Sequence, residues 1–331
     1  MNVLVTGGAG YIGSHACKAL ARAGYTPVCY DDLTAGHRWA VRWGPLETGA
    51  LEDGERLREV IRRYRPEAVM HFAALAEVAV AVADPARAYR TNVAGTLNLL
   101  EVMREAGVDQ LVLSSTCAVY GVPGTVPIPE THPQRPINPY GASKATIERM
   151  LADFDGAYGL RSIALRYFNA AGADPDAEIG EAHEPETHLI PLVLEAAAGE
   201  GGAITVHGQD YDTPDGTCIR DYIHVSDLAE AHVAALQALE HGASSAAYNL
   251  GNGRGFSVRE VIAAAEAVTG CAVAVEHGPR RPGDPPRLVG DATAAVRDLG
   301  WQSAWTDLEA IIATAWQWMQ RRQGGRQRSL E

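Results

Sequence analysis

Cysteine, lysine and long apolar runs are all scarce in this sequence, and each shortage excludes a class of protein. The 331 residues include five cysteines, without a CxxC pair or a His/Cys cluster at metal-ligand spacing. This pattern argues against a disulfide framework and a zinc finger, so we expect reduced thiols and no metal. No apolar run approaches the length of a membrane span, and the chain opens in a strand rather than a signal peptide. We therefore expect a cytoplasmic protein with no membrane partner.

Positive charge is also in short supply. Lys and Arg together number 28 against 41 Asp and Glu, which gives a net charge of −13. Nucleic-acid phosphates require clustered cations, so we expect no nucleic-acid partner. Lys18 and Lys144 are the only lysines. An anionic ligand must therefore be held by a few well-placed arginines rather than by the general field of the protein.

The N-terminal stretch carries the first functional pattern. An apolar run from Val3 is followed at once by Gly8-x-Gly10-x-x-Gly13, which opens a helix expected to end near Ala23. The glycines permit a tight turn, close approach of the backbone to a pyrophosphate, and close packing of helix on strand. The next strand ends in Asp31 and Asp32, where a carboxylate binds the ribose 2′-hydroxyl. Because that carboxylate repels a 2′-phosphate, the sequence predicts NAD rather than NADP.

Short apolar runs alternate with helical segments through the first half, which predicts an α/β fold with a Rossmann-type doubly wound parallel sheet. Buried strands are expected at 68–72, 110–115 and 161–167, and helices at 51–64 and 85–106. The acidic, proline-bearing segment 172–186 predicts a boundary or a loop, beyond which a smaller α/β part begins. Further on, Ser257-x-x-Glu260 and Thr306-x-x-Glu309 each predict a helix start with a capping box.

Tyr140 and Lys144 form the second functional pattern. On a helix, residues i and i+4 share a face, so the ammonium lies beside the phenol. A free tyrosine titrates near pH ~10, too high for a base at neutral pH. A neighbouring cation and an oxidised nicotinamide both favour the phenolate, and the pair therefore indicates a tyrosine that acts as a base.

Several segments of the chain are similar to known sequences. Four of them resemble the extended short-chain dehydrogenase/reductase superfamily: Thr6–Gly13, Ser114–Gly121, Pro139–Lys144 and Arg166–Asn169. Two later blocks, Asp210–Val225 and Pro279–Asp284, resemble the UDP-glucose 4-epimerase family, and the resemblance extends from Asn2 to about Met319. It implies reversible epimerisation at C4 of a UDP-hexose, through a transient 4-keto sugar and with bound NAD.

The same resemblance implies a domain organisation and an assembly. Residues 1–172 would form the NAD-binding domain and 173–331 mainly the nucleotide-sugar domain. A segment at about 224–250 would return to the first domain. The family pattern also implies a homodimer joined by the helices at about 85–106 and 140–157.

The resemblance assigns roles residue by residue. Tyr140 would take the proton from the sugar 4-hydroxyl, Lys144 would hold the nicotinamide ribose and lower the tyrosine pKa, and Thr116 would hydrogen-bond the same sugar oxygen. The implied cofactor-binding set is Gly7, Gly10, Tyr11, Ile12, Gly13, Asp31, Asp32, Phe72, Ala73, Asn92, Tyr140, Lys144 and Tyr167. The implied substrate-binding set is Thr116, Asn169, His188, Leu189, Thr205, His207, Arg220, Arg281 and Asp284, with the two arginines clamping the diphosphate.

Four positions bear on how this chain differs within the family. Ala50 stands where members usually carry an aspartate that binds the adenine amine, and Ala76 where some place a lysine. We therefore expect NAD to be held less tightly than is usual. His188 stands where a substrate-binding asparagine is common. Leu288 matches the position that gates the pocket around C2 of the sugar, and its intermediate volume predicts moderate tolerance of an N-acetyl group.

Three alternatives were weighed. Nucleotide-sugar dehydratases and decarboxylases resemble each other in carrying an acidic residue just after the strand threonine, whereas here Cys117 and Ala118 follow Thr116 and cannot move a proton from C5 or C6. A non-catalytic NAD sensor is disfavoured because the three catalytic positions are intact. Epimerases of UDP-N-acetylglucosamine, UDP-glucuronate or UDP-pentoses keep the same catalytic set, so these substrates stay open.

Overall fold

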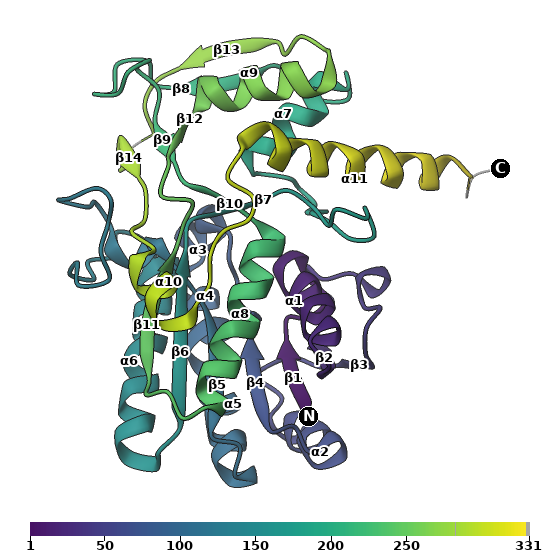
Figure 1. Cartoon of the computed structure of the whole chain (residues 1–331), viewed down its shortest axis with the longest axis vertical. Helices are drawn as coiled ribbons and strands as arrows, with labels where there is room; N and C mark the ends of the chain where they lie inside the picture. The colour runs from purple at the N-terminus through teal and green to yellow at the C-terminus, as the bar shows by residue number, and fades with distance from the viewer. Residues whose placement is uncertain (282, 329–331) are drawn as a thin grey trace.

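A parallel sheet of seven strands forms the centre of the larger part of the molecule (Figure 1). The structure is a computed structural model, and it describes residues 1–281 and 283–328. The strands are β1 (Asn2–Thr6), β2 (Thr26–Asp31), β3 (Leu46–Thr48), β4 (Ala68–His71), β5 (Gln110–Thr116), β6 (Arg161–Tyr167) and β11 (Ala246–Leu250).

The strands lie in the order β11-β6-β5-β4-β1-β2-β3, and each neighbouring pair is parallel. The order reverses between β1 and β4, and in such sheets a ligand binds outside the carboxyl ends of the strands at this switch point. The predicted Rossmann-type fold class is confirmed.

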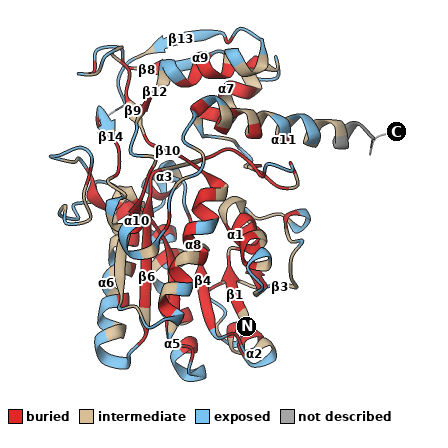
Figure 2. Cartoon of the chain, in the orientation of Figure 1, coloured by how far each residue is buried: buried red, intermediate tan, exposed pale blue. Residues whose placement is uncertain are grey.

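Helices cover both faces of the sheet. One face carries α1 (Tyr11–Arg22) and α8 (Val225–Glu240), and the other carries α2 (Gly54–Tyr64), α5 (Gly95–Ala106) and α6 (Pro139–Tyr158). Successive strand side chains point to opposite faces, so Val3 and Val5 pack with the first pair while Leu4 packs with the second set. Figure 2 shows the result, with buried strands and with helices buried on their inner sides only.

The expected helix at 85–106 is divided into three pieces. These are α4 (Pro85–Tyr89), η2 (Arg90–Ala94), which is one turn of π-helix, and α5. Such a turn often marks a functional position, because it redirects a side chain within an otherwise regular helix. Here it contains the buried Asn92. The short helix α3 (Val78–Ala83) precedes these pieces, while η1 (Arg38–Ala40) and η3 (Cys117–Tyr120) are 3₁₀ turns elsewhere in the chain.

A smaller part lies beyond the carboxyl ends of the strands (Figure 1). Its core is built from α7 (Leu189–Ala197), α9 (Val258–Thr269) and α11 (Leu308–Arg328), together with β8 (Ile204–His207). The exposed strand β13 (Val275–Gly278) pairs with β8. Two small sheets connect the parts: β7 (Asn169–Ala171) with β10 (Tyr222–His224), and β9 (Ile219–Arg220) with β12 (Phe256–Ser257) and β14 (Arg287–Leu288). Segment 172–188, between β7 and α7, has no regular secondary structure.

Later segments return to the large sheet. α8 packs against α1, β11 pairs with β6, and α10 (Thr293–Leu299) packs against β11 and α8. The capping box at Ser257 and Glu260 is present as predicted. The one expected at Thr306 is wrong, because α11 begins at Leu308 and Asp307 accepts the backbone N–H of Ala310 at 2.9 Å. An aspartate next to the predicted cap takes its role, since both side chains make good N-caps.

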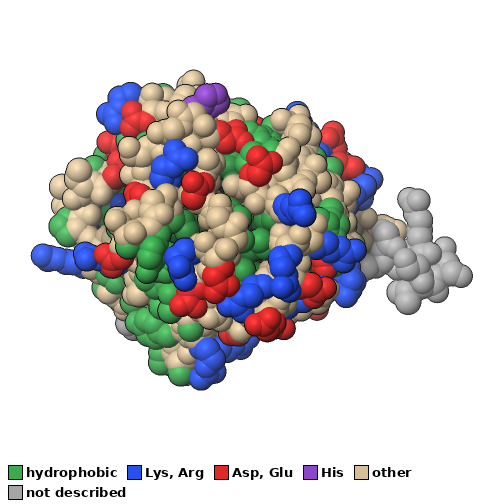
Figure 3. Space-filling view, turned by 90° about the horizontal axis from the view of Figure 1, so that it is seen from below, with side chains coloured by type: hydrophobic (Ala, Val, Ile, Leu, Met, Phe, Trp, Pro, Cys, Tyr) green, Lys and Arg blue, Asp and Glu red, His purple; other side chains and the backbone are tan. Residues whose placement is uncertain are grey.

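The end of the molecule opposite the smaller part carries charges of both signs. Figure 3 shows basic and acidic side chains interspersed over this face. On α2, Arg58 pairs with Glu105 of α5 at 2.7 Å, and Arg56 pairs with Glu59 at 2.6 Å. Among the described helices, none is both long and apolar enough to cross a membrane.

Candidate active site

The turn between β1 and α1 leaves its backbone open to an anion. Gly7 has φ +72°, and a Cβ there would lie 2.5 Å from the Ala73 nitrogen. A Cβ at Gly13 would lie 2.2 Å from the Gly7 carbonyl oxygen, so helix and loop are in direct backbone contact. Gly10 caps α1 without a side chain, and the first turn contains no acid. The first amide N–H groups of α1 are therefore free of a competing carboxylate, and the residues present fit a pyrophosphate.

The left-handed turn falls at Gly7, one residue before Gly8, where the sequence pattern predicts the start of the motif. Gly8 packs instead against β2, where an added Cβ would lie 2.8 Å from the Cys29 sulfur. The motif as folded is therefore Gly7-x-x-Gly10-x-x-Gly13.

Asp31 and Asp32 have different surroundings. The Asp31 side chain is buried at the end of β2, where its two oxygens accept N–H groups from Ala9 at 3.0 Å and Leu33 at 2.8 Å. Burial raises its pKa, and these hydrogen bonds oppose that shift. Asp32 is exposed and accepts the backbone N–H of Thr34 at 2.9 Å. The structure thus places Asp31 against the glycine loop, as a ribose ligand requires, and leaves Asp32 on the outside.

The segment after β4 supplies further predicted cofactor residues. The N–H groups of Phe72 and Ala73 both bind the Thr6 carbonyl oxygen, at 2.9 and 3.1 Å, which fixes this loop beside the glycine turn. Asn92 accepts the Leu75 N–H at 2.7 Å and donates to the Leu75 carbonyl at 3.1 Å and to the Ser143 hydroxyl at 2.9 Å. Because both amide hydrogens are used within the protein, Asn92 positions the loop and helix α6.

Thr116, Tyr140 and Lys144 come together at the carboxyl end of β5. Thr116 ends the strand, and Tyr140 and Lys144 lie in the first two turns of α6, which Asn138 caps by accepting the Gly141 N–H at 2.8 Å. The Tyr140 hydroxyl is within hydrogen-bonding reach of the Thr116 side chain. The Lys144 ammonium is buried and donates to the Ser114 carbonyl at 2.8 Å. The predicted catalytic set therefore forms one constellation.

Burial dominates the electrostatics of this constellation. It raises the pKa of Tyr140 above its ordinary value, against a smaller opposing effect of Thr116. It lowers the pKa of Lys144 to about 8, although Glu148 acts in the opposite direction. Lys144 is not among the groups that shift the pKa of Tyr140 in the protein alone, and its ammonium donates to the Ser114 carbonyl. That Lys144 lowers the tyrosine pKa when NAD is bound stays a prediction.

Two groups that support the constellation were missed by sequence reasoning. Ser114 binds Lys144 through its carbonyl and contacts the Tyr167 hydroxyl through its own hydroxyl. Glu148, one turn beyond Lys144, accepts from Ser115 at 2.5 Å and forms a buried ion pair with Arg166. Ser114 lies in a segment that resembles the superfamily, but its contacts and those of Glu148 could not be predicted, because their partners come from elements far apart in the chain.

Several predicted substrate residues gather on the side of the smaller part. Arg220 of β9 and Asp284 are in direct ionic contact. Asn169 of β7 donates its side-chain N–H to the Asp221 carbonyl at 3.3 Å. Thr205 and His207 lie on the same side of β8, both next to Gly278 of β13. Arg281 is exposed, and Leu189 opens α7.

Asp221, which follows Arg220, was given no role from the sequence. It is fully buried, and its carboxylate accepts N–H groups from Asn252 at 2.7 Å and Gly290 at 3.2 Å. Burial raises its pKa to about 6. It ties β9 to the β11–β12 loop and to the segment after β14.

His188 is the predicted substrate residue with the most distinctive surroundings. Its Nδ1 atom lies 2.8 Å from Glu181 and 3.0 Å from Glu186. Burial alone would lower its pKa, but these hydrogen bonds raise it to about 10. Its Nδ1 atom therefore faces both carboxylates.

The chain matches the model of the NAD dependent epimerase/dehydratase family over residues 3–251, and it belongs to that family. Within it, the similarity is to UDP-glucose 4-epimerases. The enzyme of Rhizobium meliloti (strain 1021) is 53% identical over 325 residues, which cover 98% of this chain and 99% of that protein. The enzyme of Lacticaseibacillus casei is 46% identical, over 96% of each chain. The predicted resemblance is confirmed.

Solved structures agree with the sequence comparison. The crystal structure of UDP-glucose 4-epimerase from Brucella ovis in complex with NAD superposes with a TM-score of 0.94, at 53% identity, over 95% of this chain and 97% of that one. The Bifidobacterium longum enzyme in complex with NAD+ and UDP has a TM-score of 0.92, at 36% identity, over 98% of this chain and 100% of that one.

Proposed function

We propose that this protein interconverts UDP-glucose and UDP-galactose by epimerisation at C4, with bound NAD. The observation that carries the proposal is the meeting of Thr116, Tyr140 and Lys144 at the strand ends, beside a glycine turn fit for a pyrophosphate. Similarity to UDP-glucose 4-epimerases over nearly the whole chain supports it.

The protein's own part in the reaction is proton transfer and orientation. Bound NAD would supply an acceptor for the C4 hydride and a donor of it back to the other face of the 4-keto sugar. Tyr140 takes the proton from the 4-hydroxyl and later gives it back, with Thr116 bonded to the same oxygen. Lys144 donates one N–H to the Ser114 carbonyl, and its remaining N–H groups would hold the ribose of the cofactor. A buried site also excludes water, which strengthens each of these interactions.

The two parts of the chain bind different ligands. Residues 1–172, with the returning segment 224–250, hold the cofactor, and the remaining segments hold the nucleotide. Arg220 and Arg281 bind the diphosphate, and Asp284 binds the uridine ribose. In the free protein Asp284 neutralises Arg220. This pair therefore opens, or shares its guanidinium, when the diphosphate arrives.

A panel of UDP-sugars tests the proposal. The purified protein with NAD is incubated separately with UDP-glucose, UDP-N-acetylglucosamine, UDP-glucuronate and UDP-xylose, and the products are separated by chromatography. Conversion of UDP-glucose to UDP-galactose, faster than any other conversion, is expected. Conversion of another UDP-sugar alone would retain the reaction class and correct the substrate. Steady accumulation of NADH in step with substrate loss would overturn the proposal.

We also propose a homodimer formed through α4, α5 and α6. Large apolar side chains are exposed on these helices: Tyr89 (42%), Leu97 (39%) and Tyr158 (58%). Light scattering of the protein eluting from a sizing column should give twice the chain mass of 35.3 kDa. Leu97→Asp should shift the mass toward the monomer, since it buries a charge in the interface.

A further inference from the structure

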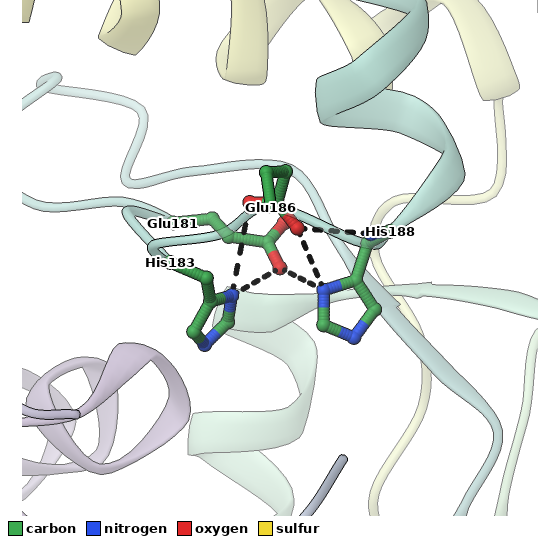
Figure 4. A group of neighbouring side chains, drawn as sticks. All are labelled: Glu181, His183, Glu186 and His188. Atoms are coloured by element: carbon green, nitrogen blue, oxygen red, sulfur yellow. Dashed lines mark hydrogen bonds and ion pairs between the residues drawn. The ribbon is translucent and has the colours of Figure 1, made fainter. Parts of the chain in front are cut away.

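Four metal-ligating side chains meet in the segment between β7 and α7, at residues that the proposed reaction does not use for chemistry. Glu181, His183, Glu186 and His188 all fall within eight positions of the chain. Their ligand atoms lie within 4.8 Å of one another, and Figure 4 shows both carboxylates directed at both rings. Sequence reasoning missed this group because it looked for histidine with cysteine.

The distances within the group approach those of a coordination shell. His183 Nδ1 lies 3.1 Å from a Glu181 oxygen and 3.7 Å from a Glu186 oxygen, while His188 Nδ1 lies 2.8 and 3.0 Å from the same two carboxylates. Four ligands about 2.0–2.2 Å from a zinc ion in a tetrahedron are separated by about 3.3–3.6 Å. The four observed distances lie on either side of that separation, and the two to Glu186 involve different oxygens of its carboxylate.

The carboxylates are held in place before any ion arrives. The Glu181 and Glu186 side chains are each only 8% exposed. Glu186 accepts the backbone N–H groups of Thr187 at 2.7 Å and His188 at 2.9 Å. The Glu181 carbonyl accepts the indole N–H of Trp318 at 2.9 Å. Because the framework is fixed from α7 and α11, binding an ion orders few additional groups.

The surroundings of the four side chains leave a path by which an ion can reach them from solvent. A cavity of about 100 Å³ adjoins the group and is lined by Glu181, His183 and Glu186. The His188 side chain is 54% exposed. An ion can therefore reach the buried carboxylates from solvent.

A second group of candidate ligands offers a contrast. Asp174, Asp176 and Glu178 also lie close together, but Lys18 already occupies their centre, with Nζ at 2.7, 3.1 and 2.9 Å. Within the described residues these are the two groups that could hold an ion. Only the Glu181 group combines imidazole with carboxylate ligands and lacks a lysine at its centre.

We propose that Glu181, His183, Glu186 and His188 bind one first-row divalent cation, of which zinc is the best match. Two imidazoles and two carboxylates are a nitrogen–oxygen set that suits zinc and disfavours magnesium or calcium, which take oxygen ligands. The bound ion ties segment 172–188 to the start of α7. It also steadies the region next to Tyr11, whose ring lies 6.4 Å from that of His183.

Zinc binding by the full-length, tag-free protein tests the proposal, in the absence of sugar nucleotide. Zinc is titrated against a chromogenic chelator, with Cys271→Ser in every protein because this cysteine is an exposed thiol. One ion per chain is expected. His183→Gln should weaken zinc binding at least about tenfold, because one of the four ligands is lost. His277→Gln, an exposed histidine on β13, is the matched control and should bind as the parent does.

Cobalt gives a readout that needs no variant. Co2+ in a four-coordinate nitrogen–oxygen site should show visible ligand-field bands, which zinc should abolish by displacement. Absence of tight zinc binding in the parent, or equal binding by the parent and His183→Gln, would overturn the proposal. Neither result bears on the epimerase reaction, which is measured separately with UDP-sugars.

Discussion

At the scale of single residues, burial shifts both Tyr140 and Lys144, the proposed catalytic pair, toward their uncharged forms. The pKa of Tyr140 is raised and that of Lys144 is lowered to about 8. The free protein thus holds a neutral phenol that is costly to ionise. In the proposed reaction, a cationic cofactor in the same buried space would favour the phenolate, which would couple proton transfer to an occupied site.

Replacing Tyr140 by phenylalanine should lower kcat by about 10²–10⁴-fold, the usual contribution of a positioned acid–base group. The fold should persist, because only a hydroxyl is removed, and the melting temperature should change little. Tyr158→Phe is the matched control, since Tyr158 lies at the opposite end of the same helix and also loses only a hydroxyl. Full activity in Tyr140→Phe would show that another group moves the proton.

The second prediction about a single residue concerns Leu288 and the tolerance of an N-acetyl group at C2 of the sugar. Its side chain packs with Cys117 against the cluster that contains Phe168, so it stands near the end of β5. A leucine leaves some room for an acetamide at C2 but offers it no hydrogen bond, which costs about 1–3 kcal/mol. UDP-N-acetylglucosamine should therefore be turned over less efficiently than UDP-glucose.

Two variants of Leu288 test this assignment against the parent. Leu288→Ser should raise kcat/KM for UDP-N-acetylglucosamine, and Leu288→Tyr should abolish that activity while sparing UDP-glucose. Unchanged ratios between the two sugars in all three proteins would show that this residue does not set the pocket.

At the scale of elements, the contact between α1 and the glycine turn is the most constrained. Gly13→Ala would place a Cβ 2.2 Å from the Gly7 carbonyl oxygen. Backbone must move to relieve this clash, so we expect loss of NAD binding and a fall of several degrees in melting temperature. Gly124→Ala is the control, because an added Cβ there meets nothing within 4 Å. Equal NAD binding by both variants, measured by isothermal titration calorimetry, would show that Gly13 does not constrain the turn.

Local patterns in the sequence predicted the elements where chain neighbours decide the structure. The strands before the glycine turn, the Tyr140 helix and the Ser257 capping box are such cases. The π-helical turn at Asn92 was not predictable, because it depends on Leu75 and Ser143, far away in the chain. The Thr306 cap failed because two adjacent residues were both good caps, and only packing chose Asp307.

The candidate site likewise contains features that the sequence predicted and features that it did not. The catalytic residues carry a spacing signal, but the partners of Lys144 and Asp31 are backbone groups that no motif identifies. The pKa of Tyr140 could not be read from its neighbour Lys144, because burial is a property of the folded chain. The ion pair between Arg220 and Asp284 joins two blocks that the sequence treats separately.

At the scale of the whole molecule, buried histidines make stability depend on pH. His232 of α8 is fully buried, and its ring packs 4.6 Å from Phe72 and 6.1 Å from Tyr167. Burial lowers its pKa to about 4, from an ordinary 6.5. Between these values the unfolded chain binds a proton that the folded chain does not. The neutral, buried His232 therefore makes its full contribution to the stability of the fold above about pH 6.5. That contribution is lost as the pH falls toward 4.

His232→Asn should remove this dependence, because asparagine does not titrate. Between pH 7 and pH 5 the parent should lose roughly 1–2 kcal/mol more unfolding free energy than the variant, measured with urea at each pH. His241→Asn serves as the control, since His241 is exposed at the end of the same helix. Parallel curves for the parent and His232→Asn would refute the assignment.

The central claim is that hydrogen leaves C4 of the sugar and returns to the same carbon within one enzyme molecule. Its most direct test is a reaction with UDP-glucose carrying deuterium at C4, in ordinary water, with the UDP-galactose product examined by mass spectrometry and NMR. Full retention of deuterium at C4, inverted configuration and no net NADH are expected. Loss of the label to solvent, or its appearance at another carbon, would show that the C4 hydrogen is not removed and returned within the enzyme.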